Sequence, residues 1–468
     1  MENVIEDHRK QWLLLVVVAL ALFLDGLDGT IVNVVLPDIA EDMSIGLGTT
    51  SWVVTVYFLV MAGLILVIGK IADSGAIKRL FVAGLLVFSF SSLACGLSFS
   101  LEMLLVFRAV QGLGAAMMAT TAFMVCVKFL PRRMTAFALS VSILGTSLGA
   151  AVGPTLGSVL AEMMSWHLVF FINVPIGIVA AVIATHAIPK DTGFSSTGFD
   201  VRGAVLLFLA MVTGLYVVES SPSHGFTTVS IVCLVVCLVC LALFVLVERR
   251  SHDPVLKLYL FRYPRLVAAI VALIFINLCY MGCLYLLPFY LQIEMGLDTI
   301  GSGLYLLIPA VATLVFCLWV GKKADEIGNR PFVIAGCLCM VIALAMFALM
   351  DVSQTWLLLI GLFLLGTTWG LAGGPIGNRM VENVPDKDRA SASSLLSFFI
   401  YFGCALGTAT FAGLFGFGSG IGSADISSTD PATFLEGFGF AMVFGVAFSA
   451  IALILSAVVR ERRGQDVE

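Results

Sequence analysis

The sequence predicts an all-α integral membrane protein with about 14 transmembrane helices. Hydrophobic residues make up 60% of its 468 residues, charged residues only 12%, and the mean hydropathy is +1.08. A soluble protein carries roughly a quarter charged residues. The apolar residues form runs of about twenty, which is the length that a helix needs to cross a bilayer, and a helix satisfies its own backbone hydrogen bonds in lipid.

The apolar runs are separated by short polar segments. The first run follows Arg9 and Lys10 and resembles the start of a signal peptide. Asp25 and Asp28 interrupt it and no small-residue cleavage site follows, so we interpret it as a retained helix. The predicted helices lie near 12–35, 50–69, 79–99, 103–127, 137–160, 167–188, 201–219, 228–247, 266–291, 301–320, 330–350, 356–378, 390–416 and 437–459.

Lysine and arginine are sorted by side when the chain is threaded with its N-terminus in the cytoplasm. The basic loop clusters then fall on the inner side, while the outer loops carry acids such as Asp38, Asp42 and Glu219. This distribution follows the positive-inside rule and predicts a multi-pass protein of the cell membrane with both termini in the cytoplasm. One helix more or fewer would place several basic clusters outside, so an even number is favoured.

An internal repeat divides the chain. "GKIAD" at 69–73 recurs as "GKKAD" at 321–325, about 252 residues later, and each copy follows the second predicted helix of its unit. We therefore predict two six-helix bundles related by pseudo-symmetry, with two linker helices between them and a substrate site near mid-membrane. The predicted parts are an N-terminal bundle at 1–190, a linker with two additional transmembrane helices at 191–255, and a C-terminal bundle at 256–468.

Three ionisable residues stand inside the predicted spans. Asp25 and Asp28 lie three residues apart on one helix face, and Arg108 is the only lysine or arginine that lies deep inside a predicted span, away from its ends. A charge at the bilayer centre costs about 2.5–3.5 kcal/mol on insertion scales, so these residues indicate proton or cation handling. The first-helix acids are the predicted partners of Arg108. The alternative is a structural acid pair and an arginine that braces backbone carbonyls.

Five motifs occur in order on successive predicted helices: "LDGTIVNVVLP" at 27–37, "GKIADSGAIKR" at 69–79, "LLVFRAVQGLGAA" at 104–116, "GTSLGAAVGPTLG" at 145–157 and "SWHLVFFINVPIG" at 165–177. In this order they resemble the fourteen-helix drug:proton antiporter family of the major facilitator superfamily, over essentially the whole chain. The resemblance implies multidrug efflux, with Asp28 as the first-helix acid and Arg108 assisting proton transfer.

A run of small residues marks the fifth predicted helix, where Gly145, Gly149, Gly153 and Gly157 recur every four residues around Pro154. This spacing lets helices approach closely, and the proline permits a bend. The resemblance implies that the run marks antiporters, and tight packing alone is the alternative. It also implies a cytoplasmic gate, although the positive-inside rule alone could explain its basic residues. The gate would comprise Gly69, Asp73, Lys78, Arg79, Gly321, Asp325, Gly328 and Arg330.

Polar and aromatic side chains in the spans are candidates for a substrate cavity, with packing against lipid or core as the alternative. The sequence contains no G-x-x-x-x-G-K-[ST] phosphate-binding motif, so we expect a proton gradient rather than ATP to drive the protein. We expect no cofactor, no metal, no nucleic-acid partner and no enzymatic activity, and a monomer that works in the lipid bilayer. The cavity candidates are Asn33, Trp52, Tyr57, Gln111, Asn277, Tyr280, Tyr285 and Trp369.

Together these features predict a proton-coupled secondary antiporter that exports small amphipathic compounds by alternating access. A transporter of the same fold with one dedicated metabolite, imported or exported, is an alternative, as is a membrane sensor that transports nothing. The 11 cysteines lie scattered in apolar runs and are interpreted as small core residues without a disulfide framework.

Overall fold

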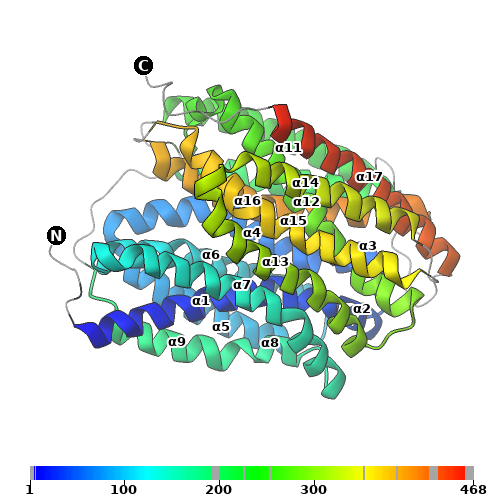
Figure 1. Cartoon of the computed structure of the whole chain (residues 1–468), viewed down its shortest axis with the longest axis horizontal. Coiled ribbons are helices and arrows are strands. Elements are labelled where there is room, and N and C mark those ends of the chain that lie inside the picture. Colours follow the sequence, from blue (N-terminus) through cyan, green and yellow to red (C-terminus); the bar gives the residue numbers. More distant parts are fainter. Residues whose placement is uncertain are drawn as a thin grey trace.

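The computed structural model is a bundle of long helices that run side by side along its longest axis (Figure 1). It describes residues 5, 7–191, 200–224, 227–251, 254, 256–350, 354–385, 388–420 and 431–458, and these residues contain no strand. Within the described part, 14 helical segments are long and apolar enough to cross a membrane. The predicted fold class and number of spans are therefore confirmed.

The helices carry the labels of Figure 1. In chain order they are α1 (His8–Val34), α2 (Leu36–Asp42), α3 (Leu47–Thr50), α4 (Trp52–Ile71), α5 (Ile77–Gly96), α6 (Leu101–Phe129), α7 (Arg132–Met163), α8 (Leu168–Phe171), α9 (Asn173–Ala187), α10 (Val201–His224), α11 (Thr228–Arg250), α12 (Pro264–Phe289), α13 (Thr299–Ile327), α14 (Arg330–Leu349), α15 (Thr355–Glu382), α16 (Arg389–Ser419) and α17 (Pro431–Val458). Short π-helical turns at Ala72–Ala76 and Tyr290–Glu294 and a 3-10 turn at Leu258–Arg262 join some of them.

Prolines and glycines set several helix ends. Pro37 stands in the first turn of α2, where a missing amide proton is tolerated, and α1 ends just before it at Val34. In the two copies of the repeat, Gly75 and Gly328 adopt φ values of +112° and +97°. Only glycine reaches such values without strain, so each copy of the loop turns at a glycine.

Glycines also allow the closest helix contact in the N-terminal part, between α1 and α7. A Cβ atom on Gly149 would lie 2.1 Å from the carbonyl oxygen of Phe23, and one on Gly145 would lie 2.6 Å from that of Ala19. The corresponding pair in the C-terminal part is α12 and α16, where Gly407 approaches the carbonyl oxygen of Leu278. The close approach predicted for the glycine run therefore occurs, and the repeat reproduces it.

The helices pack as two sets, α1–α9 and α12–α17, that meet along two seams. One seam is formed by α4 and α16, the other by α7 and α13. Each seam pairs the second long helix of one set with the fifth long helix of the other. This pairing is expected when the two sets are related by a pseudo-two-fold axis. At the second seam, Gly303 of α13 packs on Pro154 and Ser158 of α7. The exact limits of the predicted domains stay a prediction.

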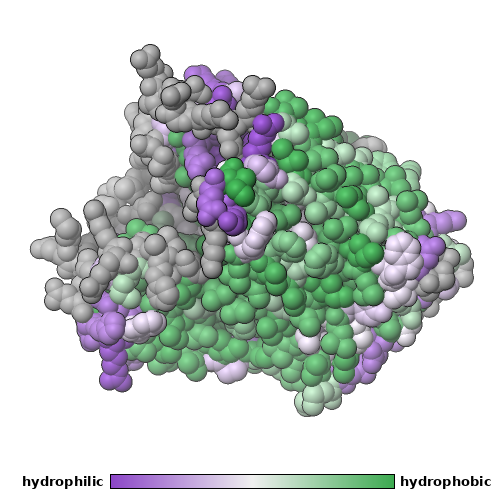
Figure 2. All heavy atoms as spheres, in the orientation of Figure 1, coloured by the Kyte–Doolittle hydropathy of each residue, from purple (hydrophilic) through white to green (hydrophobic). Residues whose placement is uncertain are grey.

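The two linker helices lie outside these sets. α10 contacts both α4 and α16 and so covers the first seam, whereas α11 packs mainly on α10 and exposes most of its apolar residues. Hydrophobic side chains cover most of the visible middle of the molecule, and hydrophilic ones gather toward its ends (Figure 2). This band is the surface expected of a protein surrounded by lipid.

Candidate functional site

A buried ion pair joins α1 to α6. Arg108 Nη1 lies 2.6 Å from Asp28 Oδ2, and both side chains are at most 1% exposed. The Nε of the same guanidinium donates a hydrogen bond to the backbone carbonyl of Val53, at 2.9 Å. The guanidinium carbon, Cζ, lies 4.3 Å from the centre of the Tyr57 ring. The structure therefore brings Asp28 and Arg108 together, as the sequence predicts, and adds a carbonyl and an aromatic face around the cation.

Uncharged polar groups complete the surroundings of Asp28. Oδ1 accepts hydrogen bonds from Gln111 Nε2, at 2.9 Å, and from Asn173 Nδ2, at 3.1 Å. Both amides also contact the hydroxyl of Ser92, and Gln111 Oε1 accepts from Arg108 at 2.8 Å. Four elements, α1, α5, α6 and α9, thus meet around one buried carboxylate that accepts from three donors.

The second acid of α1 faces the other helix set. Asp25 is 6% exposed and accepts a hydrogen bond from the hydroxyl of Tyr401 on α16, at 3.1 Å. The Tyr401 ring also stacks on Phe58 of α4, with ring centres 6.3 Å apart. Asp25 has no salt bridge among the described residues, so its charge is not balanced as that of Asp28 is. It forms a direct contact between the two sets, one turn from the ion pair.

The predicted cavity residues separate into groups. Tyr57 and Gln111 belong to the ion-pair site, whereas Trp52 packs on Tyr216 of α10. Tyr280 and Trp369 stack on each other in the C-terminal set, with centres 6.0 Å apart. The amides of Asn33 and Asn277 donate to carbonyls of their own helices, those of Gly29 and Leu273, and Tyr285 donates to the carbonyl of Leu47. Their role in a substrate cavity stays a prediction.

Described contacts of the predicted cytoplasmic gate lie within single sets. Lys78 Nζ donates to the carbonyls of Thr185 and Ile188 at the end of α9, and Asp191 accepts from the backbone amides of Lys78 and Arg79. Arg330 donates to the carbonyl of Ala457 in α17. Gly69 lies in α4, near Thr120 of α6, and Gly328 ends α13. Asp73, Gly321 and Asp325 lie outside the residues whose side chains the structure describes.

Three contacts join the two sets at the end that holds α2 and α3, the predicted outer end. We call them the outer contacts: the Tyr285 hydroxyl with the Leu47 carbonyl, Gln292 Nε2 with the Val34 carbonyl at 3.4 Å, and Thr299 Oγ1 with Asp38 Oδ1 at 3.1 Å. The three donors come from the C-terminal set and the three acceptors from the N-terminal set. They tie the sets together at this end.

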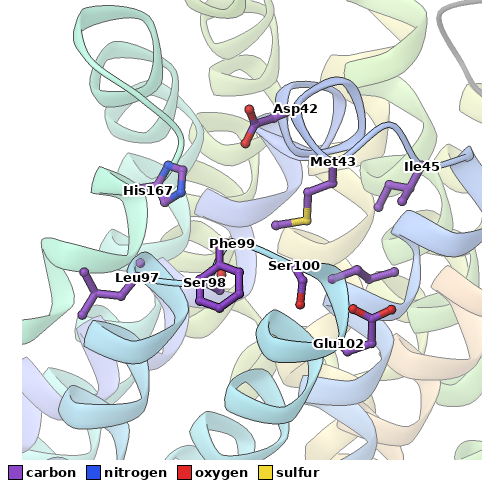
Figure 3. Close-up of a pocket in the computed structure, with 11 residues that line it drawn as sticks. Asp42, Met43, Ile45, Leu97, Ser98, Phe99, Ser100, Glu102 and His167 are labelled. Atoms are coloured by element: carbon purple, nitrogen blue, oxygen red, sulfur yellow. The ribbon is translucent and has the colours of Figure 1, made fainter.

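A polar pocket of about 730 Å³ opens at the same end of the molecule. Figure 3 shows Asp42, Met43 and Ile45 facing the turn between α5 and α6, with His167 beside them. A second, apolar pocket of about 460 Å³ lies on α13 and α15. None of the predicted cavity residues lines either of these two pockets.

Asp38 makes the outer contacts sensitive to pH. Burial raises its pKa from 3.8 to about 6, although the hydrogen bond from Thr299 opposes the shift. Between these values the folded protein binds more protons than the unfolded chain, so stability falls as the pH rises from about 4 to about 6. We expect Asp38→Asn to remove the part of this decrease that Asp38 contributes. Apparent melting temperatures in detergent at pH 4.5 and 7 check it, with exposed Glu436→Gln as the control.

An Asp38→Asn protein that loses as much stability over this pH range as the unchanged protein would contradict the assignment. Glu436→Gln is expected to behave like the unchanged protein at both pH values, because Glu436 is exposed and lies on α17, outside the outer contacts.

The site contains residues that the sequence did not single out. Asn173 lies in one of the quoted motifs, but as a neutral amide in an apolar run it gave no separate signal. Ser92 is one of three closely spaced serines in α5, with Ser89 and Ser91, and nothing in the sequence distinguishes it from them. Tyr401 lies 376 residues from its partner Asp25.

Comparison with known proteins identifies the family. A sequence profile described as the Major Facilitator Superfamily matches residues 18–408. The chain belongs to this superfamily. As a superfamily member with 14 candidate spans, it is a multi-pass membrane protein of a class that carries small molecules.

Relatives and solved structures agree with this assignment. Multidrug resistance protein Stp of Mycobacterium tuberculosis is 32% identical over 404 residues, which cover 86% of this chain and 75% of that protein. The riboflavin transporter RibZ of Clostridioides difficile is 26% identical over 409 residues, covering 87% and 89%. The crystal structure of a bacterial homolog of the human lysosomal transporter Spinster, inward-facing and unoccupied, has a TM-score of 0.68 at 18% identity, covering 96% and 97%. The last likeness shows the superfamily fold alone.

Proposed function

We propose that this protein is a proton-coupled antiporter of the cell membrane that exports small amphipathic compounds by alternating access. The observation that carries the proposal is the buried pair of Asp28 and Arg108, with three donors on the carboxylate. A buried ion pair contributes little net stability compared with well-packed apolar residues, because both ions lose their hydration. Such a pair at membrane depth therefore points to function.

In the proposed cycle, a proton competes with Arg108 for Asp28. When Asp28 binds the proton, its charge is lost and the pair weakens. Arg108 keeps two neutral acceptors, Gln111 Oε1 and the carbonyl of Val53, which can hold the cation meanwhile. When the proton leaves on the cytoplasmic side, the pair re-forms. Asp28 thus alternates between a neutral state and a paired, charged state.

Asp25 transmits this change to the other helix set. It lies one turn from Asp28 and accepts from Tyr401 of α16, so the electrostatic state of α1 acts directly on a seam between the sets. Movement at this seam would open the substrate path on one side of the membrane and close it on the other. One proton driven by 100 mV provides about 2.3 kcal/mol, which sustains roughly a fiftyfold gradient of a neutral substrate.

Export of varied compounds is supported by the relative named as a multidrug resistance protein. The relative named as a riboflavin transporter supports a second candidate, a transporter with one dedicated metabolite. Both candidates use the same fold, and they differ in the range of compounds carried.

Reconstitution tests the proposal. Purified protein in sealed liposomes with an acidic lumen and a neutral bath is expected to accumulate ethidium in the lumen, and an uncoupler is expected to stop this accumulation. Accumulation that the uncoupler leaves unchanged would exclude proton coupling. Riboflavin in place of ethidium tests the second candidate, because proton-driven uptake of riboflavin without ethidium would favour a dedicated metabolite.

A further inference from the structure

A glutamate of the linker helix α10 is buried at the edge of the first seam. Glu219 was expected in an outer loop, but it lies within α10, which continues to His224, and it is only 6% exposed. One carboxyl oxygen, Oε1, lies 2.5 Å from the hydroxyl of Ser51. The other, Oε2, is shielded from solvent and has no hydrogen-bond partner among the described residues. A charged carboxylate in this position would be poorly compensated.

The Ser51 hydroxyl has too few protons for its contacts. Its Oγ lies 2.7 Å from the carbonyl oxygen of Gly48 and 2.5 Å from Glu219 Oε1. A hydroxyl donates one proton, and a carbonyl oxygen donates none. Two separate, unshared hydrogen bonds form at these distances when Glu219 is protonated and donates its own proton to Ser51 while Ser51 donates to Gly48. The geometry therefore fits a neutral glutamic acid.

Among the residues whose side chains the structure describes, no cation forms a salt bridge with Glu219. α10 packs against α4, α11 and α16. The described titratable groups around Glu219 include the hydroxyl of Tyr285 on α12 and that of Tyr216, which precedes Glu219 by three residues on α10. The charged residues of the three packed helices all lie at the opposite end of those helices: Lys70, Glu248, Arg249, Arg250 and Arg389.

The segment that binds Glu219 is also held by the other helix set. Ser51 directly follows α3, and the first residue of α3, Leu47, accepts the hydrogen bond of Tyr285 from α12. The segment of α3 and Ser51 therefore has two partners: Ser51 contacts Glu219 of α10, and Leu47 accepts a hydrogen bond from the C-terminal set. Packing of Tyr216 on Trp52, with ring centres 6.4 Å apart, holds α10 to the start of α4. Separation of the sets at this end would disturb the Glu219 contact.

We propose that Glu219 is a second proton-binding site, which takes up a proton from the outer medium when the outer contacts form and returns it when they separate. The proton adds to a carboxylate oxygen to form the O–H that donates to Ser51, and on opening it passes to water. This site rests on the alternating access of the proposed function. Because the proton enters and leaves on one side, the site regulates opening without adding to the protons that are transported.

Hydrogen–deuterium exchange of segment 44–52 in the purified full-length protein tests this site. The closed state holds one proton more than the open state, so each pH unit is expected to lower the protection of the segment about tenfold, after correction for intrinsic exchange. Glu219→Gln mimics the neutral acid and donates to Ser51 through its amide. It is expected to remain protected across pH 6–8.5.

Two further variants make the result specific. Ser51→Ala removes the partner of Glu219 and is expected to lower protection at every pH. Asp38→Asn removes the other titratable group of the outer contacts and is expected to keep the pH dependence. The proposal is overturned if the unchanged protein shows no pH dependence, or if Glu219→Gln shows the same dependence. The measurement uses neither substrate nor a gradient, so its outcome is independent of whether transport is coupled to protons.

Discussion

Asp28→Asn is expected to abolish uphill substrate transport, with a decrease of about a hundredfold or more in the proton-driven rate, the range by which proton-transfer groups accelerate their steps. Asparagine has nearly the same shape and still accepts from Gln111 and Asn173, which contact Oδ1 in the structure. It cannot release a proton, so the site stays in its neutral state. Uptake of ethidium into acid-loaded liposomes measures the loss.

A matched control separates this effect from a general loss of charge. Asp42→Asn removes another carboxylate of the N-terminal set. Asp42 lines the polar pocket at the predicted outer end and accepts a hydrogen bond from the indole of Trp166. It is expected to transport at a rate close to that of the unchanged protein. Binding of ethidium to Asp28→Asn, measured by fluorescence polarisation, is expected to persist. Proton-driven uptake by Asp28→Asn at the normal rate would show that Asp28 is not the carrier.

Arg108→Met is expected to have the largest effect on stability. It removes one partner of a fully buried ion pair and leaves Asp28 with only neutral donors, a change that costs about 3–5 kcal/mol in comparable pairs. The double variant Asp28→Asn, Arg108→Met removes both charges and is expected to recover most of the lost stability. Thermal unfolding in detergent, followed by size-exclusion chromatography, compares the four proteins of this double-mutant cycle.

The double variant also tests why the pair is present. It is expected to fold and yet to transport nothing against a gradient, because no group remains to exchange the proton. A double variant as unstable as Arg108→Met would show that the loss comes from packing rather than from the unpaired charge. A stable double variant with full transport would assign the pair a purely structural role.

The fold could be predicted from the sequence because lipid imposes strict requirements. Each span needs about twenty apolar residues with an internally bonded backbone, and the charges are confined to one side. The predicted number of spans is confirmed for this reason. Helix ends were less certain: α1 begins at His8 rather than near residue 12, and α10 extends beyond Glu219 to His224.

The candidate site was only partly predictable. Asp28 and Arg108 stand out in the sequence because charged residues are rare in apolar spans. Opposite charges buried at a similar depth in the membrane are expected to form an ion pair. Asn173 and Ser92 carry no charge, so their selection depends on the packing of α5 and α9 around α1. Tyr401 depends on how two helix sets meet, and sequence periodicity within one helix holds no information about that contact.

Tyr285 illustrates the same limit. Its residue type and its place in an apolar run indicated a cavity residue, but its hydroxyl contacts the carbonyl of Leu47 at the predicted outer end. The protonation that we propose for Glu219 rests on the distances between three separate oxygen atoms, those of Ser51, Gly48 and Glu219. Such a feature requires coordinates.

The central claim is that substrate and protons cross in opposite directions through one carboxylate. Liposomes loaded with ethidium and the pH indicator pyranine, with equal pH on both sides and a high internal substrate concentration, test it most directly. As ethidium leaves, the account predicts that protons enter and the luminal pH falls in the unchanged protein, and that the pH stays constant with Asp28→Asn. A luminal pH that rises, or that does not change while ethidium leaves through the unchanged protein, would contradict it.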